Sequence, residues 1–202
     1  FSTIIASSLI KANAAETEKA VTLIQGEKTS QYDTVQEAVA AVSADKTQAV
    51  ITLNKDFEGA GAVVKKDQNI VFNLNGFTWT INSLVGSSGT ETNGVQLLQG
   101  STVTIENGTL TSKTASKLIQ NYCDLTIRNA TLSGQDNLTE IIVSNNNGST
   151  VITGNSTVQA AAGGIAFDSD KWGGYQGGNV TLEDGQVIGN VNATNGGKIS
   201  LN

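Results

Sequence analysis

Residues 167–178, FDSDKWGGYQGG, combine the side chains best suited to chemistry in this sequence. Asp168 and Asp170 supply carboxylate oxygens, the ligands that Ca²⁺ prefers. Trp172 and Tyr175 supply flat aromatic faces of the kind on which a sugar ring can stack. The glycines indicate a loop that leaves the regular structure, and the alternative is a Gly-rich turn with its aromatic side chains folded onto the body. We expect ligand binding, if any, at these four side chains.

The sequence gives little support for a metal site or a catalytic site. Ca²⁺ takes six to eight oxygen ligands, and Asp168 and Asp170 supply too few. The nonapeptide repeat typical of Ca²⁺-binding β-rolls is absent, and the sequence has no histidine, the commonest general base and metal ligand. We therefore expect no catalytic residue, no metal site and no cofactor, with Ca²⁺ at the two aspartates as the alternative.

The composition favours β structure. Of the 202 residues, 38% are hydrophobic, 22 are glycine and none is proline. The net charge of −6 and the single arginine, Arg128, argue against binding to a phosphate backbone. Cys123 is the only cysteine, so an intrachain disulfide is excluded, and we interpret it as a small packing residue.

The first 14 residues are interpreted as the remnant of a secretory signal peptide. An apolar run leads into Ala12-x-Ala14, which is typical of a cleavage site after Ala14. The alternative is an amphipathic anchor helix. No run of apolar residues reaches the length of a membrane span, so none is expected.

Residues 15–48 are expected to form an N-terminal strand and a capping helix. Residues 20–26 read as a strand closed by Gly26. Asp33 and Gln36 have the spacing of a capping box, and apolar residues then recur at helical spacing over 34–44. This helix is expected to cover the exposed edge of the repeats that follow.

Residues 49–202 carry an internal repeat. Four eight-residue segments can be aligned, and their fifth positions recur after 22, 26 and 29 residues: Asn107, Asn129, Asn155 and Asp184. Their last positions are apolar: Leu110, Leu132, Val158 and Val187. Strand-like repeats of this length predict an all-β, parallel β-helix of about six coils in which like residues stack. We expect the asparagines to form a ladder at a turn, the apolar positions to stack inside, and the β-helix to continue beyond Asn202.

Three segments carry a resemblance to a known family: residues 32–39 (YDTVQEAV), 50–56 (VITLNKD) and 70–79 (IVFNLNGFTW). They resemble the opening of pectin-lyase-like right-handed parallel β-helices, as found in large bacterial surface and adhesin-like proteins and in phage structural proteins. The resemblance implies the fold and a secreted or surface location. It does not imply lyase activity, because one fold hosts many functions.

The enzymes of that family would imply clustered acidic Ca²⁺ ligands with an Arg or Lys base. Asp124 and Arg128 are the nearest match, but Arg128 is expected to face Glu106 of the preceding coil as an ion pair. A hydrolase of the polygalacturonase type would need several aspartates and a histidine, and the chain has no histidine.

The leading hypothesis is therefore a non-enzymatic structural or adhesive module of a secreted or cell-surface bacterial protein. Its partners would be glycans or host and bacterial surface proteins, bound by loops and flat polar strand faces. The alternatives are a carbohydrate-active lyase or hydrolase and a phage fibre or capsid-decoration protein. We expect a monomer, or a homotrimer if the chain belongs to a phage fibre.

Overall fold

The computed structural model describes residues 18–134, 139–171, 173 and 176–202, which form two sheets and one short helix. The helix is α1 (Val35–Ala41). The larger sheet contains β1 (Val21–Gln25), β2 (Lys28–Tyr32), β3 (Gln48–Leu53), β4 (Phe57–Ala60), β6 (Asn69–Asn73), β7 (Thr78–Ser83), β9 (Thr102–Ser112), β11 (Asp124–Ser133), β13 (Ser149–Thr153), β14 (Thr157–Gln159), β16 (Asn179–Leu182), β17 (Gln186–Ile188) and β19 (Lys198–Leu201). The smaller sheet contains β5 (Ala62–Val64), β8 (Asn93–Leu97), β10 (Lys117–Asn121), β12 (Ile141–Asn146), β15 (Ile165–Asp170) and β18 (Asn190–Ala193).

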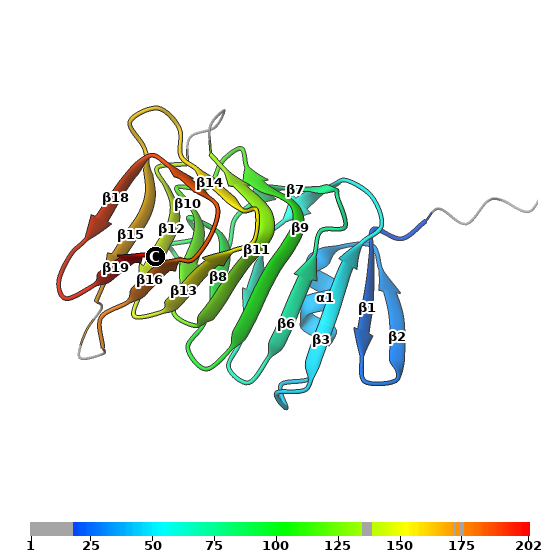
Figure 1. Ribbon diagram of the computed structural model, residues 1–202. Helices are drawn as coiled ribbons and strands as arrows, with labels where there is room; N and C mark the ends of the chain where they lie inside the picture. The colour runs from blue at the N-terminus through cyan, green and yellow to red at the C-terminus, as the bar shows by residue number, and fades with distance from the viewer. Residues whose placement is uncertain (1–17, 135–138, 172, 174–175) are drawn as a thin grey trace, which may run out of the picture.

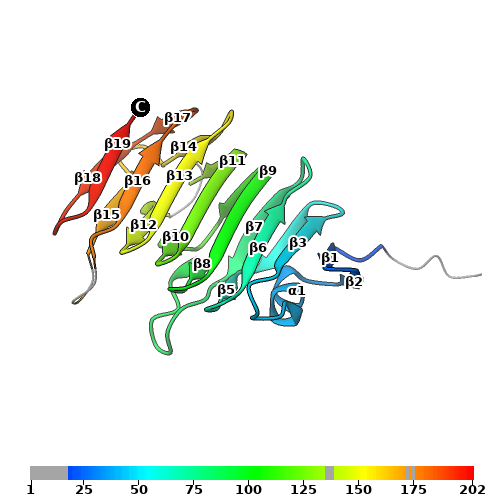
Figure 2. The same ribbon diagram turned by 60° about the horizontal axis from the view of Figure 1, so that its bottom comes forward.

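The chain passes alternately through the two sheets. From β8 onward, each strand of the smaller sheet is followed by strands of the larger one, and neighbours within each sheet are parallel. Figures 1 and 2 show the strands stacked side by side in sequence order. The prediction of an all-β chain is confirmed. Among the described residues, no helix is both long and apolar enough to cross a membrane.

The core lies between the sheets and consists of stacked apolar side chains. Leu110 pairs with Leu132, Leu132 with Val158, and Val158 with Val187. The first three are fully buried. The predicted internal row of apolar positions is therefore confirmed, because a strand period of two keeps one position of each repeat pointing inward.

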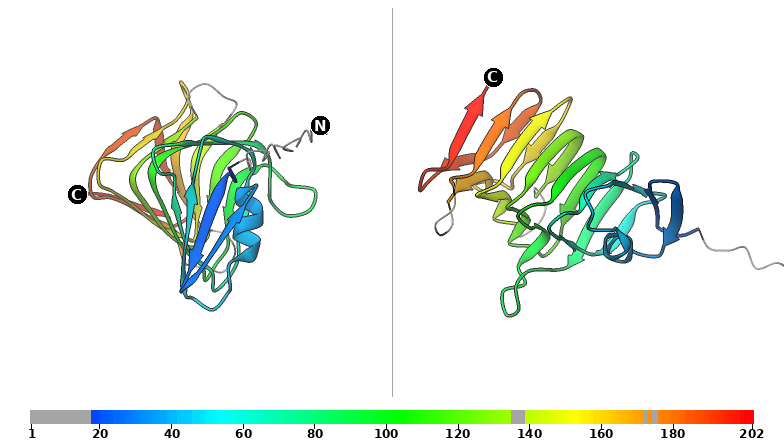
Figure 3. Two further views of the ribbon diagram at one scale, coloured as in Figure 1. Left: turned by 90° about the vertical axis from the view of Figure 1, so that its right-hand side faces the viewer. Right: turned by 90° about the horizontal axis from the view of Figure 1, so that it is seen from below.

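The N-terminal segment forms an antiparallel hairpin and α1 (Figure 3). Strand β1 confirms the strand expected at 20–26, and it pairs with β3 so that β2 becomes the edge of the larger sheet. Helix α1 packs against β5 and this hairpin, and Gln68 Nε2 donates to the Val39 and Val42 carbonyl oxygens at 3.0 Å each. The hairpin therefore shares the end of the stack with the helix.

The expected capping box is wrong by one residue. Thr34 is the N-cap, its hydroxyl accepts from Glu37 N at 3.1 Å, and Glu37 Oε2 accepts from Thr34 N at 3.2 Å. Asp33 forms an ion pair with Lys19 instead, at 2.6 Å. The helix ends at Ala41, earlier than expected, because Val42 is already extended.

The asparagine ladder expected at a turn is only partly present. Asn107 and Asn129 lie opposite one another, since the residues on either side of them are paired, and both are left-handed, with φ of 60° and 47°. The next position is occupied by Gly154 (φ 61°) because Arg128 pairs with Thr153. Asn155 follows one residue later, and its N–H donates to Asn129 Oδ1 at 3.1 Å. Beyond the turn, Leu132 pairs with Val158, as the alignment on asparagine predicted. The alignment is therefore right after the turn and wrong by one residue before it, because this repeat carries one extra residue at the turn.

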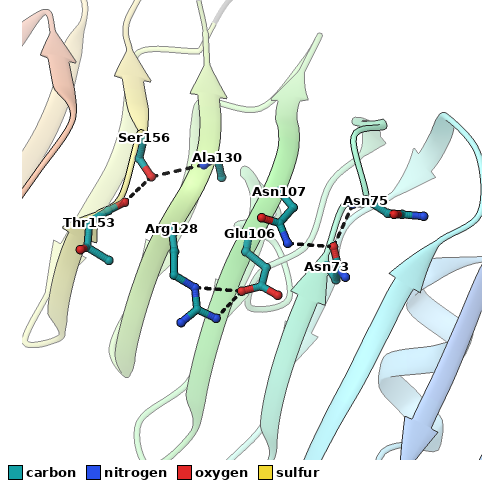
Figure 4. Close-up of polar contacts among 8 residues, drawn as sticks. All are labelled: Asn73, Asn75, Glu106, Asn107, Arg128, Ala130, Thr153 and Ser156. Carbon is teal, nitrogen blue, oxygen red and sulfur yellow. Dashed lines mark hydrogen bonds and ion pairs between the residues drawn. The ribbon is translucent and has the colours of Figure 1, made fainter.

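The row of turn positions extends in both directions. Leu182 pairs with Ile152 and Gln186 with Thr157, so Asp184 lies beside the turn of the preceding repeat that contains Gly154 and Asn155. On the other side, Asn107 Nδ2 donates to Asn73 Oδ1 at 3.3 Å, and Asn75 N donates to the same oxygen at 3.0 Å (Figure 4). These contacts lie at the surface of the larger sheet.

Candidate functional site

Asp168 and Asp170 lie at the C-terminal end of β15, in the smaller sheet. Phe167 and Ser169, which alternate with the two aspartates along β15, are buried and pair with Val143 and Asn145 of β12. The expectation that the segment leaves the body as a loop from residue 167 is therefore wrong for residues 167–170. The strand period of two places both carboxylates together on the outer face of the sheet.

The other two residues expected at this site, Trp172 and Tyr175, lie outside the described residues, as does the leader expected at residues 1–14. Within the described ranges, no three His, Cys, Asp or Glu side chains gather closely enough to hold a metal ion. Asp168 and Asp170 thus have no described third acidic partner, and a Ca²⁺ ion there would need most of its ligands from other oxygens.

Burial raises the pKa of the Asp168 carboxyl above its ordinary value. The neighbouring negative charge of Asp170 raises this pKa further, and the positive charge of Lys117 partly offsets both effects. A half-buried carboxylate next to a second one favours the protonated form, because the low-dielectric surroundings and the like charge both penalise ionisation.

A groove of about 430 Å³ lies on the same outer face, nearer to the N-terminal end of the smaller sheet. Its walls come from β8, β10 and the segment 84–92, which projects from the body between β7 and β8 (Figure 3). We call it the polar groove, and its principal lining residues are Thr90, Asn93, Gln96, Lys117, Gln120 and Tyr122. Lys117 is the only charged residue that lines it among those described.

A chain of amide hydrogen bonds orders the floor of the polar groove. Gln120 Oε1 accepts from Asn93 Nδ2 at 2.9 Å and from Gln96 Nε2 at 3.1 Å. Gln120 Nε2 donates to the Tyr122 hydroxyl at 3.0 Å. Because this hydroxyl accepts from Gln120, its own proton is available to a ligand. The Gln120 amide therefore orients the groove so that Tyr122 acts as a donor.

Asn93 contributes a second unusual feature. Its side chain is 3% exposed, and its Oδ1 accepts no hydrogen bond from any described group. The segment 84–92 returns to β8 at this residue, where Val85 and Asn93 form an antiparallel bridge. Buried oxygens without partners are rare and are commonly satisfied by water or a ligand.

A buried polar network lies inside the stack, and sequence reasoning missed it. Asn121, Asn145 and Ser169 point inward from β10, β12 and β15 and are fully buried. Asn121 Nδ2 donates to Asn145 Oδ1 at 2.9 Å, and Thr150 Oγ1 donates to the same oxygen at 2.8 Å. The 24-residue interval between the asparagines was visible in the sequence, but nothing there showed that they face inward.

On the larger sheet, the expected pairing of Arg128 with Glu106 is confirmed. The guanidinium Nε donates to Glu106 Oε2 at 3.0 Å, and Nη2 binds the same oxygen (Figure 4). Asp124 lies four residues earlier on the same strand and pairs with Thr102 and Ser149. The Arg128 guanidinium is therefore held against a neighbouring strand.

Cys123 is buried, and burial raises the pKa of its thiol to about 12. A thiol with such a pKa is almost wholly protonated at neutral pH, which suits the packing role expected of it.

Comparisons with protein-family models, with curated proteins and with solved structures each found no match for this chain.

Proposed function

We propose that the chain folds as a right-handed parallel β-helix of the pectin-lyase-like type. The alternation between two sheets and the parallel, in-register pairing of β9 with β11 and of β10 with β12 support this fold. A connection between parallel neighbours that crosses through a second layer is right-handed in nearly all proteins. Left-handed asparagines at Asn107 and Asn129 supply the sharp bends within the strands of the larger sheet.

We further propose that the chain is a non-enzymatic, adhesive module of a secreted or cell-surface bacterial protein that binds glycans. The polar groove is the observation that carries this proposal. Its amide, hydroxyl and ammonium groups donate and accept hydrogen bonds in the pattern that saccharide hydroxyls require, and the hydrogen bonds of Gln120 hold these groups in place before a ligand binds.

The proposed binding face extends from the polar groove to Asp168 and Asp170. Lys117, which lines the groove, is close enough to Asp168 to affect its ionisation. From Asp170 the chain continues into the segment that carries Trp172 and Tyr175, the aromatic residues suited to stacking on a sugar ring. In this proposal, the groove confers hydrogen-bonding specificity and the aromatic residues add apolar contact.

A glycan array followed by titration calorimetry tests the proposal. We expect binding to at least one glycan. Gln120→Ala removes the amide that connects the side chains of the groove floor, so affinity should fall about tenfold or more, the order expected from one to two lost hydrogen bonds. Thr126→Ala, on the larger sheet, is the matched control and should bind like the parent. Equal binding by the Gln120 and Thr126 variants would refute the proposed site.

One observation favours a carbohydrate-active enzyme as a second candidate. Asp168 has a raised pKa and lies on the same strand face as Asp170, and a pair of carboxyl groups is the constellation that glycoside hydrolysis uses. Incubation with pectins and host glycans, with and without Ca²⁺, distinguishes the two functions. Release of products that is abolished by Asp168→Asn would replace the adhesive function by the enzymatic one.

A further inference from the structure

A second and larger hollow, of about 520 Å³, runs along the turns that join the smaller sheet to the larger one. These turns lie along the lower edge of the molecule in Figure 1. We call this hollow the turn trough. Residues from successive repeats line it, from Lys46 and Gln68 at one end to Gly177 and Asn179 at the other. It is therefore elongated in the direction in which the strands stack.

The floor of the turn trough is made of small residues, including Ser101, Cys123 and Gly148. The buried asparagines lie directly beneath it. A Cβ atom on Gly148 would lie 2.5 Å from Asn121 Nδ2 and 2.9 Å from Asn145 Oδ1, which is too close for either contact. The buried asparagines therefore require glycine at position 148, and the absence of a side chain there keeps the trough open.

One wall of the turn trough is a regular row of polar side chains. The first residues of five strands in the larger sheet are in register, each paired with the next: Asn69, Thr102, Asp124, Ser149 and Asn179. Parallel strands are about 4.8 Å apart, so the row presents one hydrogen-bonding side chain per step over roughly 19 Å. The opposite wall includes Tyr122, which also lines the polar groove.

We propose that the turn trough binds a linear, uncharged polysaccharide laid along the stacking direction. The inference rests on the proposed function only for the class of ligand, because the residues that carry it differ from those of the polar groove except for Tyr122. A polymer with hydroxyls at a regular interval can meet the amide and hydroxyl groups of the row in succession.

The charges and the backbone pairing select this ligand over other polymers. Lys46 and Asp124 bring one charge of each sign among the described lining residues, so the trough has no net charge with which to attract a polyanion or a polycation. Thr102 and Asp124 are each paired with strands on both sides. An extended peptide gains its affinity mainly from unpaired main-chain groups at a sheet edge, and here those groups are already used.

Affinity electrophoresis in gels that contain hydroxyethyl cellulose, xylan, galactomannan or β-1,3-glucan tests the inference, with polygalacturonate as the anionic comparison. We expect retardation by at least one neutral polymer and less by polygalacturonate. Ser149→Trp, which fills the trough, should raise the dissociation constant tenfold or more. Val151→Trp is the matched control, because it adds the same side chain to the same face of β13 outside the trough.

Asn179→Ala provides a second variant in case the tryptophan disturbs folding, and it should weaken retardation without adding bulk. No retardation by any neutral polymer, or equal retardation of the Ser149→Trp and Val151→Trp variants, would overturn the inference. If only the polar-groove proposal were wrong, the result would differ from a failure of this inference. Gln120→Ala would leave all glycan binding intact, whereas Ser149→Trp would still weaken retardation.

Discussion

Removal of Asn145 tests the internal polar network most directly. In Asn145→Ala, three good hydrogen bonds are lost: Asn121 Nδ2 to Oδ1 at 2.9 Å, Thr150 Oγ1 to Oδ1 at 2.8 Å, and Nδ2 to the Gly148 carbonyl at 3.0 Å. At about 1 kcal/mol net for each bond, the free energy of unfolding should fall by ~3 kcal/mol. The buried groups that lose their partner cannot form hydrogen bonds to water instead, so this figure is a lower bound on the loss.

Urea unfolding followed by circular dichroism measures this loss. With a slope of about 2 kcal/mol per molar, the midpoint should fall by roughly 1.5 M. Asn146→Ala is the matched control, since this neighbour lies on the outer face, and its free energy of unfolding should change by no more than about 0.5 kcal/mol. Equal midpoints for the two variants would show that Asn145 does not sit in a buried, hydrogen-bonded network.

A double-mutant cycle extends the same test. Asn121 and Asn145 share a hydrogen bond, so their alanine variants should not be additive, and the coupling between them should be of the order of 0.5–3 kcal/mol. Additive losses would mean that the two amides contribute independently and that the buried polar network is not cooperative.

Three further predictions concern single side chains. Because the folded-state pKa of Asp168 is raised, the folded protein holds this proton more tightly than the unfolded chain, and stability falls as pH rises from about 3.9 through the folded pKa. Asp168→Asn should therefore raise the melting temperature at pH 7 and leave it unchanged at pH 3. Arg128→Ala should lower the free energy of unfolding by no more than about 1 kcal/mol, because the Arg128 side chain is half exposed. A larger loss in thermal unfolding would show that its pair with Glu106 is not a surface ion pair. Cys123 should react with a thiol reagent only after denaturation, and rapid labelling of the native protein would contradict its burial.

Several features could be predicted from the sequence because they depend on local periodicity. The alternation of apolar residues identified the strands, and the repeat interval placed Leu110 opposite Leu132 and Leu132 opposite Val158. Helical spacing of Val35, Ala38 and Val39 identified α1, whose apolar side is buried. The ion pair of Arg128 with Glu106 followed from the same register.

Other features could not be predicted because more than one residue type satisfies the same backbone requirement. Gly154 adopts the left-handed conformation that Asn129 also adopts, and its repeat carries one extra residue at the turn, so the alignment was right at Val158 and wrong by one residue at Val151. Threonine caps a helix as well as aspartate does, so the capping box was placed one residue too early. The sequence 167–178 contains glycines only after residue 172, and its first residues have the alternation of a strand.

By itself, the sequence determined that the chain is built from parallel strands that repeat, because a side-chain period of two and a repeat of 20 to 30 residues are properties of the chain alone. Only the tertiary structure decided which polar residues face inward and which outward. Asn121 and Asn145 fill the interior, although asparagine is mostly exposed in proteins, whereas Gln120 and Tyr122 on the same segment as Asn121 line the polar groove. The reason is that the direction in which a side chain points depends on the bend of the backbone between two sheets, and that bend is set by the packing of neighbouring strands.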